Sequence, residues 1–374
     1  MTRILLFLAL GGWLTGCARN YRLDEASPLA PAPHDVFRVA WQTSLVQRKF
    51  LDFRPQEWAR AVIDDGRVFV GSSAGRFLAI DAASGQIRWS FRTQGAISST
   101  PVVDRPTKTI YFGADDGKLY AVDLESGRLR WRYATQGTIN TAPALAEGFI
   151  LFTSSEGRIY ALDAASGKWR WQYDREMPEG FTIQGYAGVT VKGTTAFTGF
   201  ADGTLVALRI FSGDVVWTRS LKGGESRFVD IDATPSISDD VLLTASYSSG
   251  VYAVSVDNGS IRWQYPVEGV TAVSVDRKRV YFTAPEVGVV ALDRRGHLRW
   301  RQAMAKGVPS LAVCNGPYLF VTGTESGLFA VDAAHGRLLQ YFDPGHGISA
   351  APTVGGGLLT TLTNQGRLYL FRIL

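Results

Sequence analysis

One short unit recurs along this chain and constrains its fold more than any other feature does. In Ala121–Trp131, an alanine, an aspartate, a glycine and a tryptophan stand at fixed spacing. Gly127 supplies the positive φ that a tight turn needs. Leu129 and Trp131 alternate with arginines, which is the period of two of a half-buried strand. The unit therefore predicts the end of one strand, a turn and the start of the next strand.

Copies of this unit follow one another at a spacing near 40 residues, which indicates a propeller or a solenoid. Each interval has room for about four short strands, as a propeller blade does. Trp41 has the same surroundings near the start of the repeats, and Gln340 replaces the tryptophan of the last copy. The other copies span residues 79–89, 161–171, 207–217, 253–263, 291–300 and 330–340.

The two ends of the repeat region complement each other. Val36–Leu45 is expected to be the outer strand of a blade with no blade before it, whereas the C-terminal end supplies three strands without a fourth. Pairing them closes the ring and removes two open edges. Residues 36–374 are thus predicted to be an all-β, eight-bladed β-propeller of four-stranded antiparallel blades, with the last blade closed by the N-terminal strand. The eight inner strand pairs are expected at residues 68–81, 110–123, 149–163, 195–209, 241–256, 279–293, 318–332 and 358–371.

Most recurring positions of the repeat have a structural interpretation. The tryptophans of the outer strands are expected to bury their rings between blades. Asp81, Asp123 and Asp163 are expected to be turn residues. Small residues and proline, as in Ser99–Val103 and Thr141–Leu145, are expected to open the innermost strands, where the blades crowd around the axis.

The N-terminus has the pattern of an export signal. Arg3 precedes an apolar stretch of about ten residues, which is too short to span a membrane. Leu14–Cys17 resembles the lipobox of bacterial lipoproteins, which implies a signal peptide at residues 1–16 and lipidation of Cys17. Residues 18–35 are rich in proline and predict a flexible tether. The residues after Cys17 resemble those that direct lipoproteins to the outer membrane.

Composition excludes several kinds of function. The net charge is only +5 and no run of lysine or arginine is present, so nucleic acid is not an expected partner. With Cys17 lipidated, Cys314 is left alone and is expected to be a small buried residue, so no disulfide framework forms. The 4 histidines are scattered, and no metal site, cofactor site or catalytic residue is predicted.

The repeat resembles that of the quinoprotein alcohol dehydrogenases, eight-bladed enzymes that bind pyrroloquinoline quinone (PQQ). This resemblance implies the fold and leaves the reaction open. The family's adjacent cysteines are absent from this chain, and no acidic cluster that could hold its calcium is apparent.

Two stretches resemble the BamB family of outer-membrane assembly lipoproteins. Asp230–Pro235 is similar to the family's Asp-Val-Asp-Thr-Thr-Pro stretch, and Phe181–Gly185 is similar to its Leu-Ser-Leu-Arg-Gly loop. The resemblance implies that these loops dock BamA, the barrel-assembly protein. It assigns partner binding to Phe181, Ile183, Gln184, Asp230 and Asp232, with Gln184 standing where the family has arginine.

The spacing of the repeats favours the same segments independently. The connectors that follow Trp171 and Trp217 are longer than those after Trp89 and Trp131. Blade-to-blade connectors emerge on one face of a propeller, and insertions collected on one face often mark a binding face. The alternative is that Phe181 and Ile183 fold into the core and that Asp232 caps its own turn.

These observations predict a non-enzymatic scaffold, lipid-anchored on the periplasmic side of the outer membrane. It would bind a BamA-like barrel-assembly protein and assist insertion of β-barrel proteins, with unfolded barrel segments as further ligands of the blade edges. Two alternatives stay open. One is a PQQ-dependent redox enzyme of the same fold, and the other is a propeller that binds another envelope partner.

Overall fold

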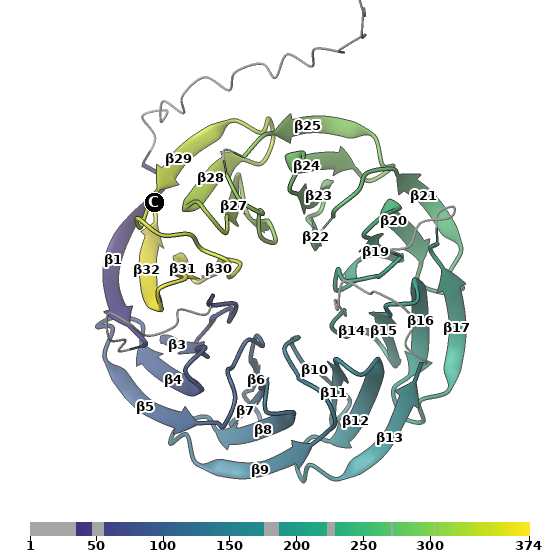
Figure 1. Ribbon diagram of the computed structural model, residues 1–374, viewed down its shortest axis with the longest axis horizontal. Coiled ribbons are helices and arrows are strands. Elements are labelled where there is room, and N and C mark those ends of the chain that lie inside the picture. Colours follow the sequence, from purple (N-terminus) through teal and green to yellow (C-terminus); the bar gives the residue numbers. More distant parts are fainter. Residues whose placement is uncertain (1–34, 47–55, 176–186, 223–228, 271, 305) are drawn as a thin grey trace, which may run out of the picture. The chain divides into compact units, whose positions relative to one another are not determined.

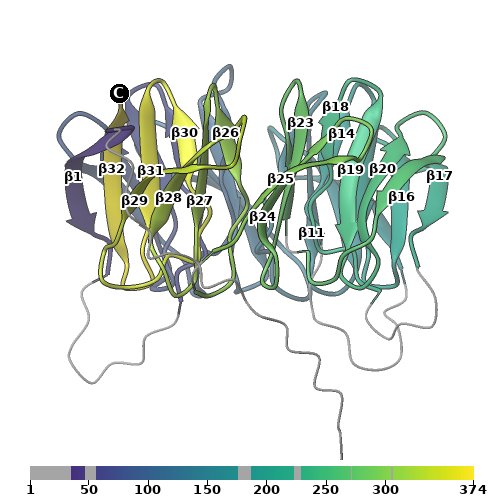
Figure 2. The same ribbon diagram turned by 90° about the horizontal axis from the view of Figure 1, so that it is seen from above.

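The computed structural model describes residues 35–46, 56–175, 187–222, 229–270, 272–304 and 306–374. Their strands form eight separate four-stranded antiparallel sheets, arranged as blades around a ring (Figure 1). Seen from the side, the strands of each blade run along the ring axis (Figure 2). The predicted eight-bladed propeller is therefore confirmed. Within the described ranges, no helix has the length and hydropathy of a membrane span.

The blades are numbered in chain order, and each runs from its innermost to its outermost strand. Blades 1 to 4 comprise β2 (Val62–Asp64), β3 (Arg67–Val70), β4 (Arg76–Asp81) and β5 (Ile87–Arg92); β6 (Val102–Asp104), β7 (Thr109–Gly113), β8 (Lys118–Asp123) and β9 (Leu129–Ala134); β10 (Ala144–Ala146), β11 (Phe149–Ser154), β12 (Arg158–Asp163) and β13 (Trp169–Asp174); and β14 (Thr190–Lys192), β15 (Thr195–Gly199), β16 (Thr204–Arg209) and β17 (Val215–Ser220).

The second half of the ring repeats this order, with one strand borrowed from the start of the chain. Blades 5 to 8 comprise β18 (Ser236–Ser238), β19 (Val241–Ser246), β20 (Gly250–Ser255) and β21 (Ile261–Tyr265); β22 (Ala272–Val275), β23 (Arg279–Ala284), β24 (Gly288–Asp293) and β25 (Leu298–Gln302); β26 (Val313–Asn315), β27 (Tyr318–Thr322), β28 (Leu328–Asp332) and β29 (Leu338–Phe342); and β30 (Thr353–Gly355), β31 (Leu358–Leu362), β32 (Arg367–Ile373) and β1 (Phe37–Ser44).

Closure of the ring follows the prediction. Strand β1 pairs antiparallel with β32, from Phe37 opposite Ile373 to Ser44 opposite Arg367. In Figure 1 the purple N-terminal strand accordingly lies beside the yellow C-terminal one. Leu368 and Leu370 of β32 then pack in one cluster with Val68 of blade 1, so the two ends of the repeat region share a core.

The outermost strands join their blades through a β-bulge at the repeated tryptophan. In blade 2, for example, Ala121 pairs with Trp131, but the next residue, Val122, pairs with Leu129. Such a bulge re-aims side chains locally. Here the indole ring points to the neighbouring blade. The indole Nε1–H groups of Trp41, Trp89, Trp131, Trp171, Trp217, Trp263 and Trp300 donate to the carbonyl oxygens of Ala82, Leu124, Ala164, Ile210, Val256, Arg294 and Ala333, respectively.

The repeated glycine makes room for this indole. Gly127 has φ +68°, and a Cβ placed there would lie 2.4 Å from Cε3 of Trp89 in the preceding blade. The same glycine–tryptophan contact recurs where Gly85 meets Trp41 and where Gly336 meets Trp300. The tryptophans therefore lock each blade to the next, which confirms their predicted place between blades.

The hydrophobic core is divided among the interfaces between blades. One cluster joins Phe69 and Phe77 of blade 1 to Phe112 and Tyr120 of blade 2, with the Phe77 and Phe112 rings stacked 3.9 Å apart. A similar cluster joins Phe320 of blade 7 to the last blade. Each blade therefore packs on its two neighbours, and the connectors that enter the innermost strands lie around the ring axis.

The repeated aspartates are turn residues, as predicted. The Oδ1 atom of Asp163 accepts hydrogen bonds from the backbone N–H and the hydroxyl of Ser166, and Arg170 pairs with its Oδ2 atom at 2.8 Å. The arginine and these hydrogen bonds lower the pKa of Asp163 to about 2. The innermost strands are shorter than expected. Strand β6 begins at Val102, so Pro101 precedes the strand instead of opening it.

Candidate functional site

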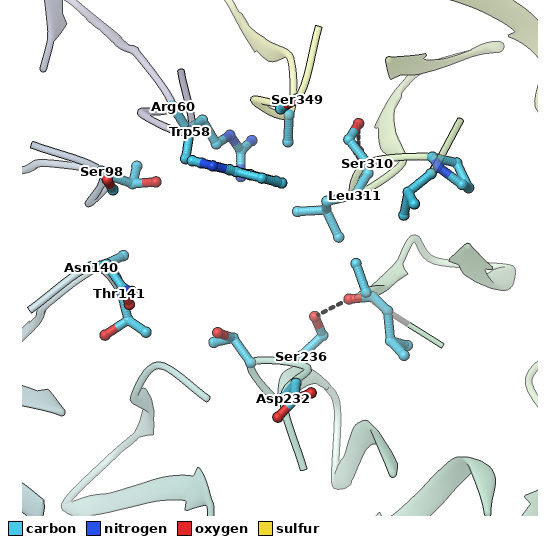
Figure 3. Close-up of a pocket in the computed structure, with 18 of the residues that line it drawn as sticks. Trp58, Arg60, Ser98, Asn140, Thr141, Asp232, Ser236, Ser310, Leu311 and Ser349 are labelled. Carbon is cyan, nitrogen blue, oxygen red and sulfur yellow. Dashed lines mark hydrogen bonds between the residues drawn. The ribbon is translucent and has the colours of Figure 1, made fainter. Parts of the chain in front are cut away.

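A cavity of about 960 Å³ lies where the connectors of several blades meet at the ring axis. Its lining is mostly small and neutral, with many serine and threonine hydroxyl groups. Among the described residues, three with charged side chains line it: Arg60, Asp115 and Asp232. Figure 3 shows Trp58 and Arg60 on one side of the cavity and Asp232 on the opposite side.

Equivalent positions in the repeat supply this lining. The fourth residue before the innermost strand is Ser98 in blade 2, Asn140 in blade 3 and Ser349 in blade 8. In blade 1 this position holds Trp58, and in blade 5 it holds Asp232. By the same count the position holds Tyr186 in blade 4, Glu268 in blade 6 and Pro309 in blade 7, so large or charged residues stand at four of the eight places. Among the described ones of these four, Trp58 and Asp232 line the cavity, and their blades are four apart in a ring of eight.

Trp58 stands on a connector that hydrogen bonds of the preceding side chain hold in place. The preceding residue, Glu57, is fully buried, and its carboxylate accepts hydrogen bonds from the backbone N–H of Ser73 at 2.7 Å and from the Ser73 hydroxyl at 2.6 Å. Trp58 itself is 53% exposed, although its indole lines the cavity. The anchored carboxylate therefore holds an accessible aromatic ring at the axis.

Arg60 stands two residues further on, at a position where the other blades have small or neutral side chains. Its Nε–H donates to the Thr353 hydroxyl at 3.0 Å, and Thr353 in turn donates to the carbonyl of Ala61 at 2.6 Å. Burial lowers the pKa of Arg60. No carboxylate of the described chain forms an ion pair with it, so the two terminal nitrogens of its guanidinium have no acidic partner there.

The predicted Asp230 and Asp232 are close in sequence but differ in their surroundings. Asp230 is 1% exposed. Asp232 lines the cavity, and its Oδ1 atom is buried without a hydrogen-bond partner among the described residues. Burial, followed by the nearby negative charge of Asp230, raises the pKa of Asp232 to about 7. The alternative interpretation is that Asp232 caps its own turn. Among the described residues, no hydrogen bond from the turn to the Asp232 side chain is present.

The other predicted site residues cannot be placed. Cys17, Phe181, Ile183 and Gln184 all lie outside the described residues. The structure therefore brings together Asp232 with Trp58 and Arg60, two residues that the sequence analysis did not select. Their signal was a departure from the small or amide residues that blades 2, 3 and 8 have at these positions.

The described residues contain no group of three or more histidine, cysteine, aspartate or glutamate side chains that could hold a metal ion. Cys314 is half-buried rather than fully buried, and its thiol lies 3.5 Å from Oδ2 of Asp276. Burial raises the pKa of Cys314 to about 11, which keeps the thiol protonated and unreactive at neutral pH.

The fold and repeat define an eight-bladed propeller with PQQ-like repeats. A family model described as outer membrane protein assembly factor BamB matches residues 38–107, 106–295 and 285–373, and the chain belongs to this family. The recognition of the BamB family from sequence is thereby confirmed.

Curated relatives carry the same description. Outer membrane protein assembly factor BamB of Legionella pneumophila (strain Paris) is 30% identical over 179 residues, 46% of each chain. The protein of this name from Kangiella koreensis is 25% identical over 206 residues, 53% of each chain. This chain thus aligns with about half the length of these relatives.

Solved structures confirm the fold. The crystal structure of BamB from Moraxella catarrhalis superposes with a TM-score of 0.77 at 22% identity, covering 90% of this chain and 100% of that chain. Quinohemoprotein alcohol dehydrogenase from Comamonas testosteroni has a TM-score of 0.72 at 16% identity, covering 90% and 76%. At these identities the likeness extends to the fold alone.

Proposed function

We propose that this protein is a non-enzymatic scaffold of the machinery that assembles β-barrel proteins in the outer membrane. The observation that carries the proposal is the match of the assembly-factor family model to nearly the whole propeller, residues 38–373. The architecture suits this role, because a ring of interlocked blades is rigid and presents many connectors to partners.

In this proposal Cys17 carries the lipid that anchors the propeller to the periplasmic side of the outer membrane. The tether of residues 18–35 separates the anchor from the first strand, β1. One lipid-modified cysteine brings several acyl carbons to the bilayer, and each buried methylene adds about 0.8 kcal/mol to membrane affinity.

The partner surface comprises the connectors before and after blade 4. Phe181, Ile183 and Gln184 supply its apolar and amide contacts, and Asp232 supplies a carboxylate to a BamA-like partner. Asp230 lies in the same connector, and its side chain is buried. Blade edges could receive extended barrel segments by strand addition.

The quinone-dependent alternative has weaker support. The alcohol dehydrogenases share the fold, but at 16% identity the likeness carries no information on the reaction. The described residues contain no group of three or more histidine, cysteine, aspartate or glutamate side chains that could contribute to a metal site. Mixing the purified protein with the quinone and calcium checks this directly, because a redox enzyme would acquire cofactor absorbance and reduce an added dye.

Affinity capture from envelope extracts tests the proposed function. The full-length protein should retain a barrel-assembly protein, identified by mass spectrometry. The double variants Asp230→Ala with Asp232→Ala and Phe181→Ser with Ile183→Ser should lose it while keeping the melting transition. Val215 and Val216, exposed on outer strand β17, provide the matched control Val215→Ser with Val216→Ser.

Two results would contradict the docking assignment. If both site variants fold and still retain the partner at the wild-type level, these connectors are not the docking surface. If a site variant unfolds the propeller, its residues belong to the core. Capture of a different envelope protein in place of the barrel-assembly protein would support the remaining alternative, a propeller with another partner.

A further inference from the structure

The axial cavity has features that packing of the blades does not require. At the connector position where three other blades have Ser98, Asn140 and Ser349, blade 1 places a tryptophan. An indole that is 53% exposed costs free energy, because transferring apolar surface out of water is favourable. The fully buried Glu57 nevertheless fixes the connector that presents this ring. The ring is therefore positioned to be covered by something else.

Arg60 adds a cation beside the ring. Its single described hydrogen bond, to the Thr353 hydroxyl, uses Nε and leaves the terminal N–H groups without a partner in the described chain. Guanidinium groups bind carboxylate and phosphate oxygens with two parallel hydrogen bonds. Arg60 is partly buried, and shielding a guanidinium from water without a carboxylate partner is costly, so an anionic group on a ligand would stabilise it.

Polar side chains on several sides of the cavity offer hydrogen-bonding groups of both kinds. Asp232 has an oxygen without a partner, and the buried hydroxyl of Ser349 also lacks one among the described residues. Asn140 and Ser236 line the same space (Figure 3). Hydroxyl and amide side chains can each donate and accept hydrogen bonds, so they can pair with ligand groups that also donate and accept hydrogen bonds.

We propose that the axial cavity binds an acidic saccharide, with one sugar ring against the face of Trp58 and its anionic group on Arg60. A sugar ring has an apolar C–H face that packs on an indole, while its hydroxyl groups point outward to Asn140, Ser236 and Asp232. A cavity of about 960 Å³ has room for more than one sugar unit. The acidic group is a carboxylate, as in a uronic acid, or a phosphate ester.

The composition of the cavity favours this class over two others. A wholly apolar ligand would leave Arg60 and Asp232 buried and unpaired, which is strongly unfavourable. A peptide would use its backbone groups, but the abundance of hydroxyl groups in the lining corresponds better to a polyhydroxylated molecule. Asp232 belongs to both proposals, but Trp58 and Arg60 are not among the docking residues, so variants of these two test the saccharide site separately from partner docking.

Isothermal titration calorimetry on the full-length protein tests the proposal with defined probes. These are digalacturonic acid, its neutral counterpart galactobiose, glucose 6-phosphate, citrate and the tripeptide Ala-Phe-Ala. The variants are Trp58→Ala and Arg60→Gln. Trp169→Ala is a matched control, because Trp169 is 52% exposed on outer strand β13, and Arg295→Gln alters an arginine in the turn before β25.

The expected result is binding of digalacturonic acid, with galactobiose at least about tenfold weaker because a charged hydrogen-bonded contact is lost. Trp58→Ala and Arg60→Gln should each weaken binding by about tenfold or more, and both controls should bind as the wild type does. Stronger binding of glucose 6-phosphate would identify the anion as a phosphate ester. Melting curves establish whether each variant is folded. If Trp58→Ala does not fold, the binding measured for Arg60→Gln tests the proposal.

Three outcomes would overturn the proposal. The first is no heat of binding from any sugar at about 10 mM, above the ~1 mM range of weak affinity. The second is binding that is indifferent to both Trp58→Ala and Arg60→Gln. The third is equal binding of citrate or of the tripeptide, which would show that the cavity selects charge or an aromatic group without the sugar. Partner capture by Trp58→Ala should match the wild type in every case.

Discussion

The side-chain amide of Gln340 donates a hydrogen bond from Nε2 to the carbonyl oxygen of Phe37 at 3.0 Å. Its Oε1 atom accepts from the backbone N–H groups of Val36 and Phe37, at 2.7 and 2.9 Å. Gln340 occupies the tryptophan position of blade 7, where the next strand to be held belongs to the opposite end of the chain. An amide can pair with free main-chain groups of an incoming strand, whereas an indole offers only one donor.

Replacing Gln340 with alanine should destabilise the closed ring by about 1–3 kcal/mol, because three main-chain groups lose their partner at once. Urea unfolding followed by tryptophan fluorescence measures this change. Gln302→Ala is the control, since among the described residues the Gln302 side chain bonds only to the carbonyl of the adjacent Ala303. If both variants lose the same free energy of unfolding, the Gln340 hydrogen bonds to Val36 and Phe37 do not stabilise the closed ring.

Removing residues 36–45 should lower the stability of the whole propeller instead of loosening one end. The deletion strips β1 from β32, exposes the edge of blade 8 and opens the cluster that contains Phe37. Differential scanning calorimetry is the measurement, and the expected result is a melting temperature lowered by several degrees with a broadened transition. A cooperative transition at the wild-type temperature would contradict the shared-blade topology.

Gly127→Ala should cost about 2–4 kcal/mol, because its Cβ would collide with the indole of Trp89 in addition to the strain at φ +68°. Gly148→Ala is a matched control: it has φ +77°, and no atom lies within 4 Å of the position that its Cβ would occupy. That variant should cost about 1 kcal/mol from backbone strain alone. Thermal unfolding of both variants separates backbone strain from the clash with the indole. Equal losses of stability in the two variants would show that Gly127 is not needed to make room for Trp89.

Asp232 should make the stability depend on pH between about 4 and 7. Its folded pKa of about 7 is above the ordinary aspartate pKa of 3.8, so over this range the folded state holds a proton that the unfolded state has lost. Stability from this group is therefore greatest at low pH and declines as the pH rises through the folded value. Asp232→Asn should abolish the decline and gain about 1–2 kcal/mol at pH 8, after allowance for partial solvation.

Urea titrations at several pH values check this prediction. Asp240→Asn serves as the control, because hydrogen bonding to Arg262 lowers the pKa of Asp240 and gives a dependence of the opposite sign. A wild type and an Asp232→Asn variant with parallel pH profiles would show that Asp232 titrates normally in the folded protein.

Cys17→Ser should yield a folded propeller that no longer sediments with membranes, because the short apolar leader cannot hold the domain by itself. Carbonate washing and fractionation of cells measure the distribution of the protein. Cys314→Ser is the control, as this residue lies within the propeller on β26. Release of the wild-type protein by detergent-free buffer would contradict the lipid anchor.

The sequence by itself determined the architecture, because the repeat is carried by local chemistry. The turn aspartates, the glycine with positive φ and the alternation up to each tryptophan specify the same hairpin in every copy, and their number gives the blades. The unmatched Val36–Leu45 segment specified the closure in the same way. The exact ends of strands, such as the one near Pro101, do not follow from the repeat, because hydrogen bonding to the neighbouring strand sets them.

Only the tertiary structure decided what meets at the axis. Trp58 and Arg60 are far from Asp232 in the sequence, and the period of the repeat does not specify which connector positions face inward. Closure of the ring brings blades 1 and 5 to opposite sides of one cavity. It also places Asp230 in the interior and leaves an oxygen of Asp232 without a hydrogen-bond partner in the described part of the chain, because burial depends on all neighbouring connectors and not on the local Asp-x-Asp pattern.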